Sequence, residues 1–317
     1  MNTIIQKIDS EKNNIYIKRE DLIPFSFGGN KVRKAFKFFE HIGDEYDYVV
    51  TYGSSSSNHA RVVANLCRKF NKKCIIISPE EVYKDTYNSL MMKKFNAEII
   101  IVPVNEVSKT IDDTLERLKN QGHTPYFIQG GGHGNIGTSA YVDCYKEILE
   151  YEKENSIVFD YIFLASGTGT THAGLVCGQL TNKDNNKKII GISIARNANR
   201  GKEVIIDSIR DYLEENNIKA SEEKINEYTY FLDDYIVGGY GLYNDDIVET
   251  IRNMLFKEGL PLDPTYTGKA MTGMFKYISK NEINNKNILF IHTGGTPLFF
   301  DFLENENKII RDLKISN

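Results

Sequence analysis

One lysine of the sequence stands in a setting that suits covalent chemistry. Lys31 follows two glycines and an asparagine in FGGNKVRK (27–34), and Arg33 and Lys34 lie close to it. Neighbouring cations lower the pKa of a lysine and favour its free amine, which forms a Schiff base with a carbonyl compound or acts as a base. An ordinary basic start of a helix has the same composition, so this segment alone leaves both interpretations open.

A second segment, SGTGTTHAGL (166–175), suits a phosphate group. It follows an apolar run and opens a helical pattern. Its glycines allow an anion to approach the backbone, and the amides of a helix start point toward such an anion. The threonine hydroxyls at positions 168, 170 and 171 add donors. The segment lacks the G-K-[S/T] of a P-loop and has His172 where a dinucleotide-binding turn has glycine. A tight turn between strand and helix is the alternative interpretation.

Polar residues also gather in YGSSSSNHAR (52–61), at another transition from strand to helix. One serine, Ser56 or Ser57, would be enough to cap the helix, yet four serines and Asn58 occur together. A site for a small carboxylate at the helix N-terminus explains this surplus.

The elements that must position these segments alternate between strands and helices. Apolar, β-branched runs predict strands at 46–53, 72–78, 97–104, 159–166, 187–195 and 286–295, and amphipathic patterns predict helices at 57–70, 139–151, 171–180, 245–258 and 268–279. This alternation predicts an α/β fold with mainly parallel sheets. Two more glycine-rich segments, 129–138 and 292–297, complete a set of five, of which four directly follow a plausible strand. Ligands bind beyond the carboxyl ends of parallel strands.

Composition limits the classes of function. The chain has 317 residues, 39 of them basic and 43 acidic, and its net charge of −4 argues against non-specific nucleic-acid binding. No apolar stretch reaches about 18 residues and no signal-peptide core is present, so we expect no membrane span and a cytoplasmic location. The four cysteines, at positions 67, 74, 144 and 177, form no C-x-x-C pair, which favours buried packing and no metal site.

Together these motifs resemble one family. A lysine in GGNK-x-RK, an S-N-H after a strand, a Gly/Thr-rich turn and a C-terminal HTGG-x-P are similar to pyridoxal-phosphate enzymes of the tryptophan-synthase-β-like fold, also called fold type II. The branch of D-cysteine desulfhydrase and 1-aminocyclopropane-1-carboxylate deaminase is the most similar. The resemblance extends from residue 17 to residue 300.

This resemblance implies a fold, a cofactor and partners. The fold is two α/β lobes, each a three-layer open sheet, with pyridoxal 5′-phosphate between them. We expect a small inserted lobe at 36–143 and a large lobe formed by 1–35 and 144–317. A small amino acid is the implied substrate, and a homodimer is the implied assembly.

The resemblance also assigns roles to individual residues. Lys31 matches the lysine that binds the cofactor covalently and then removes the Cα proton of the substrate. Asn58 matches an asparagine that hydrogen-bonds the 3′-oxygen of the cofactor, and Ser57 matches a serine near the substrate carboxylate. Tyr240 and Tyr266 match two active-site tyrosines that act as acids, bases or positioning groups, with core packing as the alternative. The residues that match the phosphate-binding turn are Gly167, Thr168, Gly169, Thr170 and Thr171.

The partner of the pyridine nitrogen separates the branches of the family. A carboxylate keeps the ring protonated and makes it a strong electron sink, whereas a hydroxyl gives a weaker sink that suits β-elimination. The deaminase branch has Glu after the tyrosine of DP-x-Y and Leu after the histidine of H-x-GG, where this chain has Thr267 and Thr293. We predict that Thr293 contacts the nitrogen, with Thr267 as the second candidate.

Two departures from the desulfhydrase pattern concern the expected substrate space. That branch has Gln before the S-N pair, where this chain has Ser56, and a serine is more usual where this chain has His133 and Gly134. D-Cysteine itself is therefore less favoured as the substrate.

These observations predict a lyase that eliminates a β-leaving group from a small amino acid and yields pyruvate and ammonia. The alternatives within the family are a β-replacement synthase, a 1-aminocyclopropane-1-carboxylate deaminase and a racemase. A protein that binds pyridoxal phosphate without turnover is the alternative from another class. A nicotinamide-dependent enzyme is disfavoured, because no G-x-G-x-x-G follows the first strand.

Overall fold

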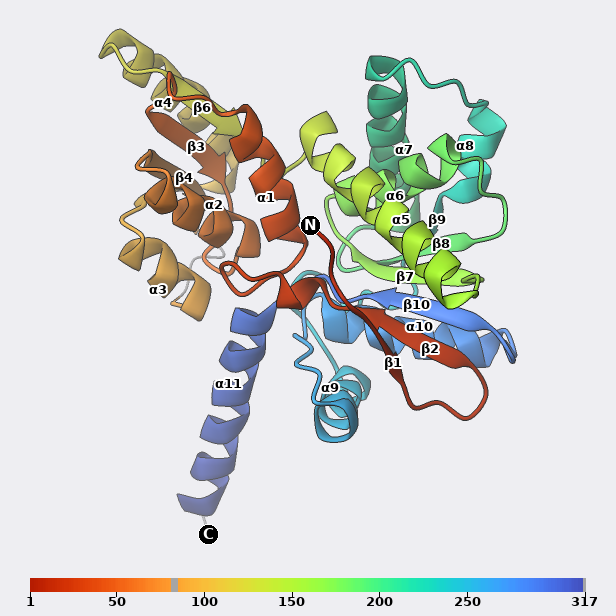
Figure 1. Ribbon diagram of the computed structural model, residues 1–317. Helices are drawn as coiled ribbons and strands as arrows, with labels where there is room; N and C mark the ends of the chain where they lie inside the picture. Colours follow the sequence, from red (N-terminus) through yellow and green to blue (C-terminus); the bar gives the residue numbers. More distant parts are fainter. Residues whose placement is uncertain (81–84, 316–317) are drawn as a thin grey trace. The chain divides into compact units, whose positions relative to one another are not determined.

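The computed structural model describes residues 1–80 and 85–315, and from residue 307 onward it describes the backbone alone. Within this range the chain forms two compact units (Figure 1). Unit 1 consists of Met1–Asn30 and Gly134–Thr296, and unit 2 consists of Lys31–His133 and the segment that begins at Pro297. The chain thus passes from unit 1 to unit 2 directly before Lys31. The lobe boundaries expected from the sequence, at 36 and 143, stay a prediction.

Unit 1 is built on a six-stranded sheet with the order β1-β2-β10-β7-β8-β9. β1 is antiparallel to β2, and the remaining pairs are parallel. The strands are β1 (Ile5–Ile8), β2 (Asn14–Lys18), β7 (Tyr161–Ser166), β8 (Lys188–Ser193), β9 (Tyr230–Leu232) and β10 (Asn287–Ile291). A short 3₁₀ helix, η1 (Glu20–Leu22), follows β2.

Helices cover both faces of this sheet, as continuous apolar strands require. They are α5 (Asn135–Asn155), α6 (Thr170–Thr181), α7 (Ala198–Glu215), α8 (Glu222–Tyr228), α9 (Asp245–Glu258) and α10 (Thr267–Lys280). Figure 1 shows α5, α6 and α7 on one face and α10 on the other. Unit 1 therefore has three layers.

Two glycines of α6 set how closely it packs against α5. A Cβ on Gly174 would lie 2.4 Å from Cβ of Tyr141, and one on Gly178 would lie 2.4 Å from Cβ of Tyr145. Both tyrosines are fully buried in the main hydrophobic cluster of the unit. Because glycine alone permits this approach, the two positions fix α6, and with it the turn from which α6 begins.

Unit 2 is built on a parallel four-stranded sheet with the order β5-β4-β3-β6. The strands are β3 (Tyr48–Tyr52), β4 (Lys73–Pro79), β5 (Glu98–Val102) and β6 (Pro125–Ile128). Its helices are α1 (Asn30–His41), α2 (Asn58–Lys69), α3 (Tyr87–Lys94), η3 (Val104–Glu106), α4 (Val107–Asn120) and α11 (Thr296–Ile315), and the first residue of α1 and of α11 belongs to unit 1.

The core of this sheet follows the two-residue period of its strands. Val50, Ile75 and Ile77 pack with Leu118 of α4 in one buried cluster. The alternate residues Val49 and Ile76 are also fully buried, and they face the other side of the sheet. Unit 2 thus repeats the layered α/β architecture of unit 1.

The fold class predicted from the sequence is confirmed. Each of the six predicted strands and five predicted helices has a counterpart in the described chain. All four cysteines are buried and free, as the composition suggested. Within the described residues, we find no helix whose length and apolar character would let it cross a membrane.

Candidate active site

Two glycines shape the turn that precedes Lys31. Gly28 and Gly29 have φ angles of 61° and 97°, which favour glycine. A Cβ on Gly28 would lie 2.1 Å from the carbonyl oxygen of Asp21, and one on Gly29 would lie 2.8 Å from the carbonyl oxygen of Thr293. The backbone N–H of Asn30 donates to that same Thr293 oxygen at 3.0 Å. Unit 1 therefore fixes the chain up to the residue before Lys31.

Lys31 shares a backbone carbonyl with a second lysine inside unit 2. Nζ of Lys31 lies 3.2 Å from the oxygen of Gly131, and Nζ of Lys34, one turn further along α1, lies 2.6 Å from it. Burial lowers the pKa of Lys31 to about 8, against a smaller opposing effect of its hydrogen bond with Lys34. Burial and the positive charge of Lys31 hold the pKa of Lys34 well below its usual range. A substantial fraction of free amine at position 31 follows, as Schiff-base chemistry requires.

His59 lies beside these lysines and is neutral. The hydroxyl of Thr51 donates to the oxygen of Ile128 at 2.7 Å, so its contact of 2.9 Å with Nε2 of His59 requires the imidazole to donate. Nε2 therefore carries the ring proton, and Nδ1 is an acceptor. Burial and the charges of Lys31 and Lys34 hold the pKa of His59 well below its usual value. No local sequence pattern predicts this contact of His59 with Thr51.

Ser57 and Asn58 begin helix α2 after β3. Ser57 is the N-cap residue, and its Oγ accepts from the N–H of Ala60 at 3.1 Å. Oδ1 of Asn58 accepts from Nδ2 of Asn88 at 3.0 Å. The capping role considered for the serine run is therefore real for Ser57, and a role at a substrate carboxylate stays a prediction.

The predicted phosphate-binding residues form the turn from β7 into α6 in unit 1. Gly169 is the N-cap of α6 with a left-handed φ of 93°, and a Cβ there would lie 3.0 Å from Cγ1 of Ile205. Gly167 and Thr168 are half-buried, whereas Gly169, Thr170 and Thr171 are buried. Gly169, the N-cap residue, has no side chain with which to cap the helix. The first amides of a helix lack intrahelical acceptors, so the turn suits a phosphate.

Asn30 joins this turn to the segment that leads into α1. Its Nδ2 donates to Oγ1 of Thr171 at 3.0 Å, while its backbone N–H is bound to Thr293. The asparagine of the GGNK motif thus ties three predicted site segments of unit 1 together. The motif identified the segment but not this structural role.

Of the two threonines considered for the pyridine nitrogen, Thr267 already uses its hydroxyl in hydrogen bonds within the protein. Oγ1 of Thr267 donates to Oδ2 of Asp263 at 2.8 Å and accepts from the N–H of Asp263 at 2.9 Å. Asp263 also accepts from the N–H groups of Thr265, Tyr266 and Thr267, so it caps the start of α10. Because the only proton of the Thr267 hydroxyl is used, Thr293 stays the preferred candidate.

Tyr240 and Tyr266 are brought together, as a shared site requires. Their hydroxyl oxygens lie 2.7 Å apart, and their rings pack edge to face with centroids 5.9 Å apart. Tyr240 keeps 42% of its surface exposed, which argues against pure core packing. Burial raises the pKa of Tyr266 well above its usual value, and the neighbouring Tyr240 adds to this effect.

A buried lysine that the sequence did not reveal holds the loop of Tyr240. Nζ of Lys269, in α10, lies 3.1, 2.6 and 2.9 Å from the backbone oxygens of Ile194, Ile236 and Gly239. The side chain is fully buried. Burial lowers its pKa to about 8, while the charge of Asp263 opposes this effect. All three ammonium protons have acceptors, so Lys269 fixes the backbone directly before Tyr240.

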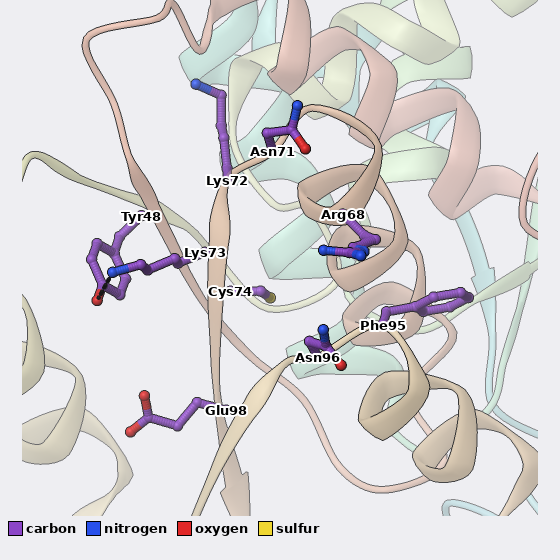
Figure 2. Close-up of a pocket in the computed structure, with 9 residues that line it drawn as sticks. All are labelled: Tyr48, Arg68, Asn71, Lys72, Lys73, Cys74, Phe95, Asn96 and Glu98. Atoms are coloured by element: carbon purple, nitrogen blue, oxygen red, sulfur yellow. Dashed lines mark hydrogen bonds between the residues drawn. The ribbon is translucent and has the colours of Figure 1, made fainter.

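A pocket of about 360 Å³ elsewhere in unit 2 is not part of this arrangement (Figure 2). Its lining includes Tyr48, Lys73 and Glu98, which are the first residues of β3, β4 and β5. Figure 2 shows Lys73 directed toward Tyr48, whose hydroxyl lies 3.1 Å from Nζ. The pocket therefore lies at the amino ends of the strands, whereas Ser57 and Asn58 follow a carboxyl end.

One group of potential metal ligands occurs in unit 1. Glu20, Cys144 and Glu147 bring ligand atoms within 4.8 Å of one another. Protein donors already bind these carboxylates, since the hydroxyl of Tyr141 donates to Glu20 at 3.0 Å and Nζ of Lys18 donates to Glu147 at 2.8 Å. The group is accounted for as a buried hydrogen-bond network.

Comparison with known proteins adds to this geometry. The sequence model of a family described as "Pyridoxal-phosphate dependent enzyme" matches residues 3–294. A D-cysteine desulfhydrase from Serratia proteamaculans is 32% identical over 299 residues, which cover 91% of this chain and 88% of that protein. The crystal structure of an ACC deaminase homologue has a TM-score of 0.85 at 30% identity and covers 96% of this chain and 93% of its own.

A more distant solved structure shares the fold. A hydrogen sulfide-producing enzyme from Fusobacterium nucleatum has a TM-score of 0.65 at 20% identity, and the match covers 93% of this chain and 95% of that chain.

Proposed function

Because the chain belongs to the family of pyridoxal-phosphate-dependent enzymes, we propose that it is a lyase that eliminates a β-leaving group from a small amino acid. The observation that carries this proposal is the amine of Lys31. Its pKa is lowered to about 8, and the turn at Gly28 and Gly29 fixes the chain directly before it. Such an amine condenses with an aldehyde and later accepts a proton from carbon.

Each unit, taken by itself, offers groups that suit part of pyridoxal 5′-phosphate. The turn at Gly169, an N-cap residue without a side chain, offers backbone amides to its phosphate. Lys31 offers the amine for its aldehyde, and Asn58 an amide for its 3′-oxygen. When bound, the cofactor supplies an electron sink that stabilises negative charge on the substrate Cα. The protein residues then bind and orient the substrate and transfer its protons.

The choice of elimination rests on the group that faces the pyridine nitrogen. Thr293 is our candidate, since the hydroxyl of Thr267 is committed to Asp263. A hydroxyl leaves the nitrogen unprotonated, and this weaker sink favours loss of a β-leaving group, which carries the electrons away. The proposed products are pyruvate and ammonia. The similarity to a D-cysteine desulfhydrase supports this reaction.

The remaining residues receive supporting roles in the proposal. Lys31 removes the Cα proton, and Ser57 lies near the substrate carboxylate. Tyr240 and Tyr266 form a hydrogen-bonded pair that positions the substrate or passes a proton. We further propose a cytoplasmic homodimer, which size-exclusion chromatography with light scattering tests directly.

The experiment is a substrate panel with a matched pair of lysine variants. Cofactor-loaded protein is incubated with D- and L-amino acids that carry β-leaving groups, while pyruvate and ammonia are measured. We expect Lys31→Ala to abolish turnover and borohydride labelling, and Lys37→Ala on the same helix to retain both. Pyruvate formation by Lys31→Ala at the wild-type rate would refute the proposal.

The same substrate panel also tests two related reactions. The likeness to an ACC deaminase homologue favours opening of the cyclopropane amino acid, which would give 2-oxobutanoate. Thr267 and Thr293 disfavour this reaction, because the deaminase branch has Glu and Leu there. A β-replacement enzyme would form adducts with added thiols or amines in place of pyruvate.

A further inference from the structure

A fully buried asparagine of α3 contacts the asparagine expected to bind the cofactor. Oδ1 of Asn88 accepts from Nε of Arg61 at 2.7 Å. Nδ2 of Asn88 donates to the backbone oxygen of Ser56 at 2.9 Å and to Oδ1 of Asn58 at 3.0 Å. All four residues belong to unit 2. Asn88 therefore sits between a buried cation and the start of α2.

The chemistry of its neighbours fixes which way the amide of Asn88 points. A guanidinium only donates hydrogen bonds, so the atom of Asn88 that faces Arg61 is oxygen. A backbone carbonyl only accepts, so the atom that faces Ser56 is nitrogen. The two contacts determine the same orientation independently. Asn amides are otherwise ambiguous, because oxygen and nitrogen are similar in size.

This orientation is passed on to Asn58. The nitrogen of Asn88 requires an acceptor, so the Asn58 atom that it contacts is Oδ1. The amide nitrogen of Asn58 then lies on the opposite branch of the side chain. A hydrogen-bond chain from Arg61 through Asn88 thus selects one of the two orientations of Asn58, the one that directs its N–H donors away from α3.

The start of α3 is anchored to the same loop by a second residue. Oγ1 of Thr86 donates to the backbone oxygen of Ser55 at 2.7 Å, and Thr86 forms a capping box with Ser89. Thr86 and Asn88 therefore hold the loop of serines at successive carbonyls, those of Ser55 and Ser56. Only Asn88 of these two contacts Asn58, which makes Thr86 a matched control.

We propose that Asn88 is a positioning residue that fixes the amide of Asn58 with its nitrogen as the donor to the 3′-oxygen of pyridoxal phosphate. This inference rests on the proposed function, since it requires Asn58 to contact the cofactor. A donor at the 3′-oxygen stabilises negative charge there. It thereby favours the visible-absorbing form of the bound cofactor over the near-ultraviolet form that carries a proton on this oxygen.

The experiment compares the absorbance spectra of cofactor-loaded variants at one pH. Asn88→Asp keeps the size of the side chain and an acceptor for Arg61, but it offers no N–H to Asn58. The Asn58 amide then turns its nitrogen toward position 88 and its oxygen toward the cofactor. We expect the ratio of the near-ultraviolet to the visible band to rise by roughly two- to tenfold, the range of one hydrogen bond.

Three further variants separate orientation from local damage. Thr86→Val disturbs the same helix start and is expected to lower the thermal midpoint without changing the band ratio. Asn88→Leu removes the donor without adding a charge and is expected to shift the ratio in the same direction as Asn88→Asp. In an Asn58→Leu background, Asn88→Asp should cause no additional shift.

The outcomes distinguish the inference from the proposed function. A shift in Asn58→Leu with a wild-type ratio in folded Asn88→Asp and Asn88→Leu would overturn the positioning role and leave the cofactor assignment intact. A wild-type ratio in Asn58→Leu would overturn the contact of Asn58 with the 3′-oxygen and the positioning role with it. Equal shifts in Thr86→Val and Asn88→Leu would show general loosening of the loop and also overturn the inference.

Discussion

Two lysines of this chain, the half-buried Lys31 in unit 2 and the buried Lys269 in unit 1, have their pKa values lowered to about 8 by desolvation. Their surroundings differ. Lys269 directs its three protons at three backbone oxygens, whereas Lys31 shares the oxygen of Gly131 with the neighbouring amine of Lys34. A lowered pKa therefore does not identify a catalytic lysine. An ammonium with three acceptors acts as a structural cross-link, while an amine beside a second buried amine is available for chemistry.

Replacing Lys31 should separate activity from stability most strongly. We expect Lys31→Ala to lower kcat by about a thousandfold or more, since both the covalent amine and the base are lost. Its free energy of unfolding should not fall. An unfolded lysine titrates near its usual pKa, so burial of Lys31 costs stability below pH 8, and this cost disappears as the pH rises toward the unfolded pKa. Urea unfolding of the cofactor-free protein checks this, and a large loss of stability would contradict the comparison.

Replacing Lys269 should do the reverse. Lys269→Met leaves three backbone carbonyls without their donor, and we expect the free energy of unfolding to fall by about 2–4 kcal/mol. Lys276→Met on the same helix is the control, because Lys276 is half-exposed and pairs with Asp246 on the surface. That change should stay within about 0.5 kcal/mol. Equal unfolding midpoints of the two variants would show that Lys269 is not a cross-link.

The pH dependence of cofactor binding should report the lowered pKa of Lys31. Below pH 8 the amine of Lys31 is mostly protonated and does not attack an aldehyde, so the rate of cofactor incorporation should fall about tenfold for each pH unit. Above pH 8 the rate should level off. Stopped-flow absorbance after mixing cofactor-free protein with pyridoxal phosphate measures this rate. A rate that still climbed steeply beyond pH 9 would mean that burial does not lower the pKa of Lys31.

The sequence predicted Lys31 through its motif, but Lys269 could not be found in this way. GGNK-x-RK signals a glycine turn before a lysine, and the positive φ angles of Gly28 and Gly29 bear out that turn. The acceptors of Lys269 come from positions 194, 236 and 239, which are distant in the chain, so no local pattern marks it. The role of Asn88 is hidden for the same reason.

A similar limit applies to the fold. The six predicted strands are apolar runs of five to seven residues, whereas β2, which also has five residues, was not predicted. β1, β6 and β9 have only three or four residues, and in these short segments periodicity carries little information. The turns at 53–58 and 166–170 were predicted as helix starts from their residues. The commitment of Thr267 to Asp263 depends on the side-chain geometry of the α10 start and was not predicted.

The smallest effect concerns the tyrosine pair that Lys269 supports. Tyr240→Phe and Tyr266→Phe each remove one side of the hydrogen bond of 2.7 Å, and we expect each to lower kcat by about tenfold, with the double variant little worse than either. In a Lys269→Met background the carbonyl next to Tyr240, that of Gly239, loses its donor, so the pair is no longer held together. Tyr240→Phe should then cost less than it does in the wild type. Steady-state kinetics of this cycle test whether the cross-link acts through Tyr240, and strictly additive effects would show that the two features are independent.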